Sequence, residues 1–553
     1  MNIPEHADVV IAGGGPCGLM LANELGRRGV SVLLVDEKPS TAFNPQANAT
    51  QARTMEHYRR LGFAEEIRSQ GLPAEYPTDI AYFTRYAGYE LARFKLPSAR
   101  EAGDVVKTLS GSWSAAELPH RVSQKFVETV LRRQAEALPG VSVHFGWRLV
   151  EFTQDANCVS ATIESMSDGT RRSVRGDYLV GADGPRSQVR ERLGFGYEGE
   201  TGVQRDFMGG RMCAVYLRAP DFYKVVPHAP AWMYVTFNHD RRTFMAAVDG
   251  KGEFAFHTQL RPGEDESAIT DDMAKRMFWR AAGAEMPIEI ITRGTWTAGH
   301  ALVSDGFRRG RVFLGGDAAH LFTPAGGLGY NTAIEDAVNL GWKLAAVLKG
   351  TGGPALLESY QGERQPLARR NTGYARQFAD SLGFHAAPEE LEQPGAAGDA
   401  ARAEAGAYFH DHARREFNIP GVTFGGRYDG SPIIVPDGTQ PPPDAPNAYV
   451  PSACPGGRAP HLWVDGNRSL YDLFGFEWTL LQLEPDAPTG AFAQAAGEMG
   501  VDLRIVHLND PAARALYEAD LALIRPDQIV AWRGNDDAGA GAVLAQVTGV
   551  SPS

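Results

Sequence analysis

The apolar positions of the N-terminal segment follow a strand, a helix and a second strand. An apolar run at 9–12 leads into a glycine-rich turn, the apolar residues of 19–26 then recur at helical spacing, and a second apolar run at 32–35 ends at Asp36. A short apolar run, an amphipathic helix and another apolar run are typical of a βαβ unit with parallel strands. This pattern predicts an α/β domain at the start of the chain.

The turn between the first strand and the helix carries a phosphate-binding pattern. Gly13, Gly15 and Gly18 form a GxGxxG motif. In such a motif the first glycine allows a tight turn, the second lets the backbone approach a pyrophosphate, and the third lets the helix pack close to the strand. The helix N-terminus supplies free N–H groups, and Asp36 stands where an acid can bond a ribose. The unit predicts dinucleotide binding without distinguishing FAD from NAD.

The middle of the chain changes to strand-like periodicity. Short apolar runs fill 141–177 and 212–260, and the turn residues NHD at 238–240 predict a hairpin. A helix is expected within 121–138, and another apolar strand ends in the ADGPRS sequence at 182–187. These patterns predict a β-rich insertion between cofactor-binding segments.

A second glycine-rich loop follows an apolar strand at 312–314. The sequence GGDAAHLFTPAGGLGYN occupies 315–331 and places Asp317 at the strand end, where α/β folds bind ligands. Apolar residues at helical spacing then continue to Leu348, and Gly350 suits the C-terminal cap of that helix. We expect a second helix N-terminus to face the ligand that Asp317 approaches.

Together, the GxGxxG unit, the ADGPRS strand end and the loop at 315–331 resemble the FAD-dependent aromatic hydroxylases of the p-hydroxybenzoate and phenol hydroxylase type. The resemblance covers nearly the whole chain. It implies an α/β fold with a Rossmann-like FAD-binding domain of the GR2 type, an inserted β-sheet substrate domain and a C-terminal thioredoxin-like domain. The implied division is 1–75, 105–190 and 300–375 for FAD binding, 76–104 and 191–299 for substrate binding, 376–440 for a helical or linker segment, and 441–553 for the thioredoxin-like domain.

The resemblance also implies which residues contact FAD. They are Gly13, Gly15, Pro16, Gly18, Asp36, Glu37, Arg53, Gln124, Asp183, Gly316, Asp317, Pro324, Gly327, Leu328, Gly329 and Asn331. Asp317 would meet the ribityl or ribose–pyrophosphate part, and the loop from Pro324 to Asn331 would lie beside the isoalloxazine ring. Relatives often read GGQGMNTG in this loop, so we expect a different ring-facing pocket here.

The catalytic candidates are Asn48, Tyr234 and Pro324. The loop PQANATQART at 45–54 resembles phenol hydroxylases, in which an aspartate near the position of Asn48 helps to deprotonate the phenol. An asparagine can hydrogen-bond a hydroxyl but cannot take its proton at neutral pH, so a base would have to lie elsewhere. The alternatives that the sequence does not separate are Tyr234, His228, His239 and His300. We expect His320 to support the cofactor-binding loop and not to act as a catalytic residue.

Composition and charge exclude several classes. A net charge of -13 argues against a nucleic-acid surface. The four cysteines form no CxxC pair and no metal-ligand spacing, so we predict no metal, no thioredoxin chemistry and a reducing cytoplasm. No segment approaches about 18 uninterrupted apolar residues, so we predict no membrane span.

The function that the resemblance implies is a single-component monooxygenase. NAD(P)H would reduce FAD, O2 would add to give a C4a-hydroperoxide, and its distal oxygen would attack a phenolic or other aromatic substrate. The absence of a second GxGxxG domain for NAD(P)H agrees with this family, and a homodimer is expected. Two alternatives stay open: Baeyer–Villiger-type oxygenation of a polyketide, and a flavin-fold protein that binds a ligand without catalysis.

Overall fold

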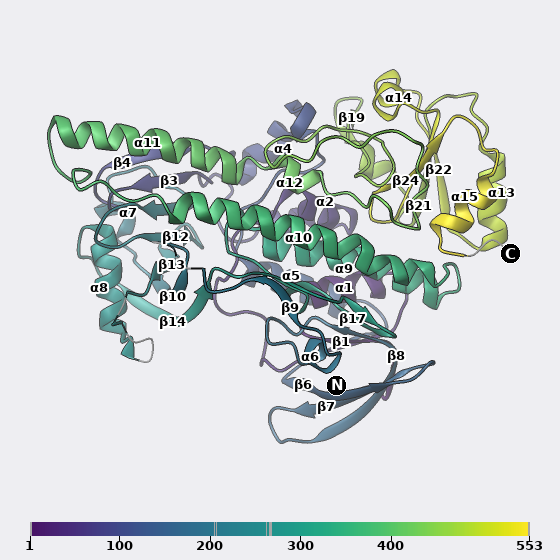
Figure 1. Cartoon of the computed structure of the whole chain (residues 1–553), viewed down its shortest axis with the longest axis horizontal. Coiled ribbons are helices and arrows are strands. Elements are labelled where there is room, and N and C mark those ends of the chain that lie inside the picture. The colour runs from purple at the N-terminus through teal and green to yellow at the C-terminus, as the bar shows by residue number, and fades with distance from the viewer. Residues whose placement is uncertain (1–2, 204, 206, 262, 265–267, 551–553) are drawn as a thin grey trace.

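The computed structural model describes residues 3–203, 205, 207–261, 263–264 and 268–550. Figure 1 shows a β-rich region at one end (teal), a C-terminal unit at the other (yellow), and a parallel sheet with its helices between them. The long helix α10 (Ala355–Gly383) runs across the molecule and connects these parts.

The central sheet has eight strands and a parallel core. Its path runs β16-β17-β8-β1-β2-β5, and every neighbouring pair from β17 to β5 is parallel. The core strands are β1 (His6–Ala12), β2 (Val32–Asp36), β5 (Val141–Phe145), β8 (Arg171–Gly181) and β17 (Val312–Leu314). The others are β16 (Arg308–Arg309), β6 (Trp147–Gln154) and β7 (Val159–Ser165), the last two forming a hairpin beside β8. This topology confirms the predicted Rossmann-like fold.

Three helices pack on this sheet through apolar faces. They are α1 (Pro16–Gly26), α5 (Gln124–Glu136) and α9 (Leu328–Leu348). Helices α1 and α9 approach closely: a Cβ added to Gly341 would lie 2.5 Å from the Glu24 Cβ. The shorter helices are α2 (Ala52–Arg60), α3 (Ala64–Arg68), α4 (Ala99–Thr108) and α6 (Gln188–Arg192).

A seven-stranded sheet forms the β-rich region. Its order is β14-β10-β13-β12-β11-β3-β4, so two strands from the segment between α1 and α5 join five from the insertion. The strands are β3 (Ile80–Phe83), β4 (Glu90–Phe94), β10 (Gly210–Arg218), β11 (Met233–Thr236), β12 (Thr243–Ala247), β13 (Glu253–Gln259) and β14 (Glu289–Ala298). The NHD residues connect β11 and β12 as an antiparallel pair, which confirms the predicted hairpin.

Helices cover the seven-stranded sheet. Helices α7 (Phe222–Val225) and α8 (Asp271–Ala282) contribute Phe222 and Phe278 to its core. Helix α11 (Ala396–Phe417) contributes Phe409, which stacks on Tyr82 with ring centroids 4.7 Å apart. Much of the segment 376–440 is therefore packed helix. Its Ala- and Gly-rich composition does not by itself decide between a helix and a linker. A small sheet joins β9 (Tyr197–Glu200), β15 (Ala301–Ser304) and β18 (His320–Leu321).

The C-terminal unit has a mixed four-stranded sheet ordered β22-β21-β23-β24. Only β21 and β22 are parallel, and helices connect and flank the strands, as expected for a thioredoxin-like domain. Its elements are β21 (Trp478–Gln482), α13 (Gly490–Met499), β22 (Leu503–His507), α14 (Pro511–Tyr517), β23 (Leu521–Ile524), β24 (Val530–Gly534) and α15 (Ala540–Val547), preceded by α12 (Pro420–Phe424), β19 (Trp463–Val464) and β20 (Arg468–Ser469).

A buried ionic network joins the C-terminal unit to the central helices. Glu363 on α10 pairs with Arg525 at 2.8 Å and with Lys343 of α9 at 2.7 Å, and all three side chains are out of solvent. The unit is thus fixed to the helices that cover the central sheet. Within the described part of the chain, no helix is both long and apolar enough to cross a bilayer.

Candidate active site

The motifs found in the sequence gather at one edge of the central sheet. Strands β17, β8, β1 and β2 are adjacent and parallel, so their carboxyl ends lie side by side. Asp317, Asp183, Gly13 and Asp36 stand at or just beyond these ends. In open α/β sheets this edge is where ligands bind.

The three glycines of the first loop have different steric surroundings. Gly13 has φ +113°, and a Cβ there would lie 2.1 Å from the Ala182 carbonyl oxygen. A Cβ at Gly18 would lie 1.9 Å from the Gly13 carbonyl oxygen, whereas a Cβ at Gly15 would meet nothing within 4 Å. The first and third glycines are therefore required by the protein itself, and Gly15 leaves space above the helix N-terminus for a phosphate.

Asp36 fixes this loop to the end of β2. Its Oδ2 accepts a hydrogen bond from the Gly14 N–H at 2.7 Å, and its Oδ1 accepts one from the Lys38 N–H at 2.8 Å. A carboxylate has further lone pairs, so Asp36 can still accept from a ribose hydroxyl. The adjacent Glu37 is exposed.

The two glycine loops, far apart in sequence, meet at Cys17. A Cβ added to Gly315 would lie 3.0 Å from the Cys17 Sγ, and one added to Gly316 would lie 3.1 Å from the Cys17 Cβ. Asp317 follows immediately; its side chain is exposed and accepts no hydrogen bond from the described residues. Tyr197 donates to its backbone oxygen at 2.6 Å. The arrangement leaves a free carboxylate beside two loops that can approach an anion.

Asp336 on α9 holds the second loop from behind. Its Oδ2 accepts from the Gly316 N–H at 3.1 Å and lies 2.6 Å from the His320 Nε2, while its Oδ1 accepts from the Arg364 Nε at 2.8 Å. Burial acts to raise the pKa of Asp336, but His320 and Arg364 outweigh it and hold the pKa below its usual value. His320 is itself fully buried, so it belongs to the frame of the loop, as predicted.

Asn331 ties the start of α9 to the loop before α2. Its Oδ1 accepts from the Gln51 N–H at 2.8 Å and the Thr54 Oγ1 at 2.7 Å, and its Nδ2 donates to the carbonyls of Ala49 and Gly327. These partners use the whole amide, so the Asn331 side chain holds the loop from Pro324 to Asn331 in shape. The expected contact of Asn331 with FAD stays a prediction and would be made by its backbone.

Comparisons with known proteins support the same reading. A family described as "FAD binding domain" matches residues 6–375, and one described as "Aromatic-ring hydroxylase, C-terminal" matches 452–550. The chain belongs to the FAD-dependent aromatic-ring hydroxylases. Among similar proteins, 2,4-dichlorophenol 6-monooxygenase of Delftia acidovorans is 31% identical and covers 96% of this chain and 95% of its own length.

Two other similar proteins also align with nearly the whole of this chain. Aklavinone 12-hydroxylase RdmE of Streptomyces purpurascens is 31% identical over 97% of both chains. The solved structure of RebC soaked with chromopyrrolic acid, with bound 7-carboxy-K252c, is 32% identical, has a TM-score of 0.89 and covers 99% of this chain and all of its own. The match extends through the C-terminal unit.

Residues at the sheet edge of the hydroxylase fit FAD. Gly15 opens to free space, the Asp317 carboxylate accepts no hydrogen bond from any residue that the structure describes, and α1 and α9 both begin at these loops. Helix N-termini favour anionic groups such as a pyrophosphate. Asp183 accepts from the Ser187 hydroxyl at 2.5 Å and from the Val189 N–H at 3.2 Å, and burial raises its pKa. Gln124 donates to Glu128 at 2.6 Å.

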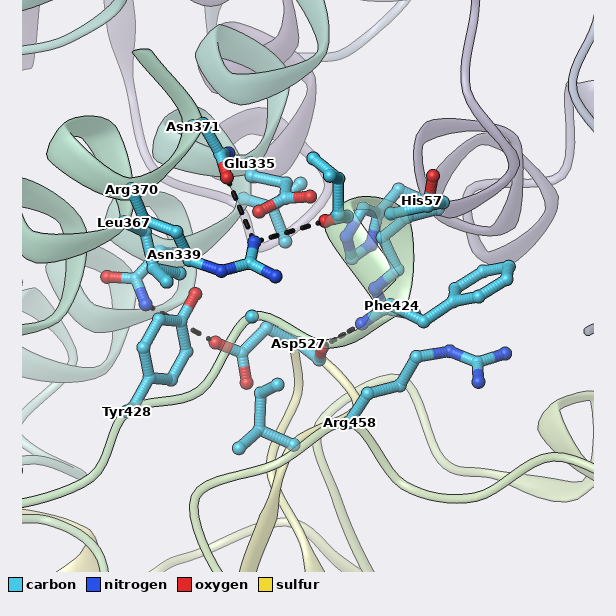
Figure 2. A pocket seen from close by; sticks show the side chains of 16 residues that line it. His57, Glu335, Asn339, Leu367, Arg370, Asn371, Phe424, Tyr428, Arg458 and Asp527 are labelled. Atoms are coloured by element: carbon cyan, nitrogen blue, oxygen red, sulfur yellow. Dashed lines mark hydrogen bonds between the residues drawn. The ribbon is translucent and has the colours of Figure 1, made fainter. Parts of the chain in front are cut away.

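Arg53 is a correction to the expected FAD contacts. It lines a polar cavity between α2, α9, α10 and the C-terminal unit. Figure 2 shows this cavity, with His57 of α2 and Asp527 of the C-terminal unit among its walls. Its Nη1 donates to Glu56 at 2.9 Å and to Gln528 at 2.7 Å, and its Nη2 donates to the Asp527 carbonyl at 2.6 Å. The guanidinium therefore connects domains, which sequence spacing could not reveal because its partners lie near the C-terminus.

Tyr234 is a second correction, because it is a core residue of the seven-stranded sheet. It is 1% exposed, its ring packs on Phe222 with centroids 5.2 Å apart, and its hydroxyl accepts from the Ala231 N–H at 2.9 Å. The structure thus offers no catalytic role for this hydroxyl. The three histidine alternatives are also engaged or peripheral: His228 contacts the Gly88 carbonyl, His300 contacts Thr201, and His239 is exposed in the hairpin turn.

The opposite face of the same sheet contacts the loop before α2. Side chains alternate along β11, so Met233 lies on the face opposite Tyr234, together with the half-buried Phe244 and Trp296. Thr292 of β14 donates to the Asn44 Oδ1 at 2.5 Å, which brings the loop before α2 to this face. In that loop the Oδ1 of Asn48 is buried without a partner among the described residues.

Proposed function

We propose that this hydroxylase is a single-component monooxygenase that inserts one oxygen atom of O2 into a phenolic ring and uses NAD(P)H as reductant. The observation that carries the proposal is the meeting of the two glycine loops at Cys17, at the edge of the central sheet where ligands bind in α/β folds. The relatives named for 2,4-dichlorophenol and aklavinone support an aromatic substrate.

The residues of this chain would bind the cofactor and orient the ring. Bound FAD would supply the redox chemistry, accepting a hydride from NAD(P)H and activating O2. The N-terminus of α9 would stabilise negative charge in the cofactor, because its first N–H groups lack intrahelical partners. Leu328 and Gly329 open this helix, and the exposed Pro324 precedes it, so we keep all three as ring-side positions.

Asn48 would hold the substrate hydroxyl without removing its proton. Its buried Oδ1 lacks a partner, and a phenolic O–H is a donor that could satisfy it. The phenolic proton would then leave by another route, because an amide is not a base at neutral pH. Met233 and Phe244 would supply apolar contact for the ring and help to exclude water.

The test uses the purified, FAD-loaded protein with a panel of substituted phenols. We expect flavin absorbance after loading and oxidation of NADPH or NADH that a phenol accelerates. Product NMR should show an aromatic C–H replaced by C–OH; conversion of a ketone to an ester would favour Baeyer–Villiger chemistry instead. Absence of bound flavin, or of any substrate-stimulated oxidation, would contradict the proposal.

Three further expectations accompany it. The domain division follows the resemblance, a homodimer should be visible by sedimentation, and the protein should work in a reducing compartment. The four free, buried cysteines support the last expectation, because none requires an oxidising environment.

A further inference from the structure

Arg121 is a buried cation without a counter-ion in the part of the chain that the structure describes. Its side chain is 4% exposed, it makes no hydrogen bond or ion pair with the described residues, and its Nη1 is out of solvent. Arg364, Arg458 and Arg525 are equally buried, but each pairs with a carboxylate at 2.8 Å or less. An unpaired buried charge is costly, and Arg121 differs from these three arginines in having no partner among the described residues.

Aromatic rings hold the Arg121 guanidinium in place. Its central carbon lies 4.5 Å from the centre of the Trp232 ring and 5.9 Å from that of Phe417. Burial lowers the pKa of Arg121 to about 10, and Glu416 acts against this decrease, so the group stays charged at neutral pH. Stacking fixes the plane of a guanidinium and leaves its edge free for a planar anion.

Glu416 does not neutralise Arg121 directly. Its Oε1 accepts from the Gly326 N–H at 2.9 Å, and its Oε2 lies 2.8 Å from the His412 Nε2. No ion pair joins Glu416 to Arg121 within the described residues. Glu416, the acid that acts on the pKa of Arg121, therefore holds the loop from Pro324 to Asn331, and the Arg121 Nη1 has no partner among the described residues.

The backbone places Arg121 beside the ring-side loop. Thr50 and His120 form an antiparallel bridge, so the next residue pair along it is Ala49 and Arg121. A Cβ added to Gly327 would lie 2.9 Å from the Ala49 Cβ. Arg121 thus stands where the loop before α2, the start of β11 and the end of α11 come together.

We propose that Arg121 is a substrate-binding residue that selects aromatic substrates carrying a carboxylate, which its free guanidinium edge would pair. This inference depends on the proposed hydroxylase function for its substrate class. Arginine and a carboxylate can form two parallel hydrogen bonds, which gives both energy and orientation. The carboxylate would hold the far end of the substrate while the phenolic ring faces the cofactor.

The experiment measures binding to the FAD-loaded full-length protein without turnover. The probes are hydroxybenzoic and hydroxycinnamic acids, each compared with its own primary amide, and the readout is the change in flavin absorbance. We compare the parent with Arg121→Gln and Arg121→Lys, and with Arg415→Gln as a control. Arg415 is an exposed arginine on the same helix as Phe417, paired with Asp411.

We expect the parent to prefer the acid, and Arg121→Gln to reduce the acid-to-amide affinity ratio by roughly 10- to 100-fold, as for a hydrogen bond to a charged group. Arg121→Lys should keep part of the preference, and Arg415→Gln all of it. Equal binding of acid and amide by the parent, or an unchanged ratio in Arg121→Gln, would overturn the proposal. So would a weaker FAD affinity with the acid preference intact at saturating FAD, because Arg121 would then serve the cofactor.

Two readouts separate this proposal from the hydroxylase function. If acids bind in an Arg121-dependent manner but never stimulate NAD(P)H oxidation, the anion site stands and hydroxylation fails. If only neutral phenols bind and stimulate oxidation, hydroxylation stands and the anion site fails. Should Arg121→Gln fold poorly, Arg121→Lys, which keeps the charge but lacks the planar fork, still decides between the outcomes.

Discussion

The two glycine loops reach the same edge of the sheet by different means. In the first loop, Gly13 and Gly18 are required by backbone atoms of their own βαβ unit and of the neighbouring strand. In the second loop, Asp336 holds Gly316, and Glu416 holds Gly326, through side chains from two different helices. The first loop is specified by sterics and by Asp36 of its own βαβ unit, and the second by polar side chains from distant helices.

The two loops therefore differ in what maintains their shape. A loop whose glycines are sterically required keeps its shape once its strand and helix form. A loop held by buried carboxylates depends on every partner being present, because removing one leaves a charge unpaired out of water. We therefore expect damage to the second loop to cost more stability than damage to the first.

The largest effect should follow Asp336→Ala. The change leaves His320, Arg364 and the Gly316 N–H without their shared acceptor, so we expect the free energy of unfolding to fall by about 3–5 kcal/mol. Urea unfolding followed by circular dichroism measures it. Glu335→Ala is the matched control: it removes the neighbouring carboxylate, partly exposed and 3.1 Å from Arg364, and should cost less than about 1 kcal/mol. Equal losses in both variants would contradict the assignment.

Asp317→Ala should leave the protein folded and weaken its binding of FAD. The carboxylate has no partner in the described protein, so we expect stability to change by no more than about 0.5 kcal/mol. If it accepts a hydrogen bond from FAD, the dissociation constant should rise roughly 10- to 100-fold. Equilibrium titration of the apoprotein with FAD measures this. Full FAD occupancy of the purified variant at micromolar protein concentration would place Asp317 away from the cofactor.

A pair of glycine substitutions sharpens the comparison within the first loop. Gly18→Ala forces a Cβ against the Gly13 carbonyl, and we expect it to destabilise the protein by about 1–3 kcal/mol. Gly15→Ala should leave stability within about 0.5 kcal/mol, since its φ of -79° suits alanine and its surroundings are open, yet it should weaken FAD binding. Thermal unfolding of the two apoproteins and FAD titration separate the effects. A destabilised Gly15→Ala apoprotein would show that the open space is needed for folding.

The same contrast explains how much of the molecule could be predicted from its sequence. The βαβ unit, the hairpin at 238–240 and the strand before Asp317 were predictable, because local periodicity and turn residues encode them. The roles of Asp336 and Glu416 were not, since acids on long helices look like ordinary surface residues until the fold buries them.

Two wrong site predictions have a related cause. Arg53 matched a motif, but its partners Gln528 and Asp527 are brought to it only by the docking of the C-terminal unit. Tyr234 lies one position from Met233. Because side chains alternate along a strand, only one of these two residues points toward the cofactor loops. The sequence gives the alternation but does not say which face is covered by α7 and α8.

The smallest effect is expected at Asn48, which lies outside both glycine loops. Asn48→Asp would place a carboxyl where the amide oxygen is buried without a partner, so its pKa should lie above the usual value near 4. If this position faces the phenol, the ionised carboxylate can accept the phenolic proton, and hydroxylation should rise with pH through that pKa and level off above it. The parent should lack this acidic limb. Gln46→Glu, an exposed acid in the same loop, is the control and should match the parent. Superimposable pH profiles of product formation for all three proteins would mean that Asn48 lies away from the hydroxyl, and the orphaned oxygen would then need a different donor.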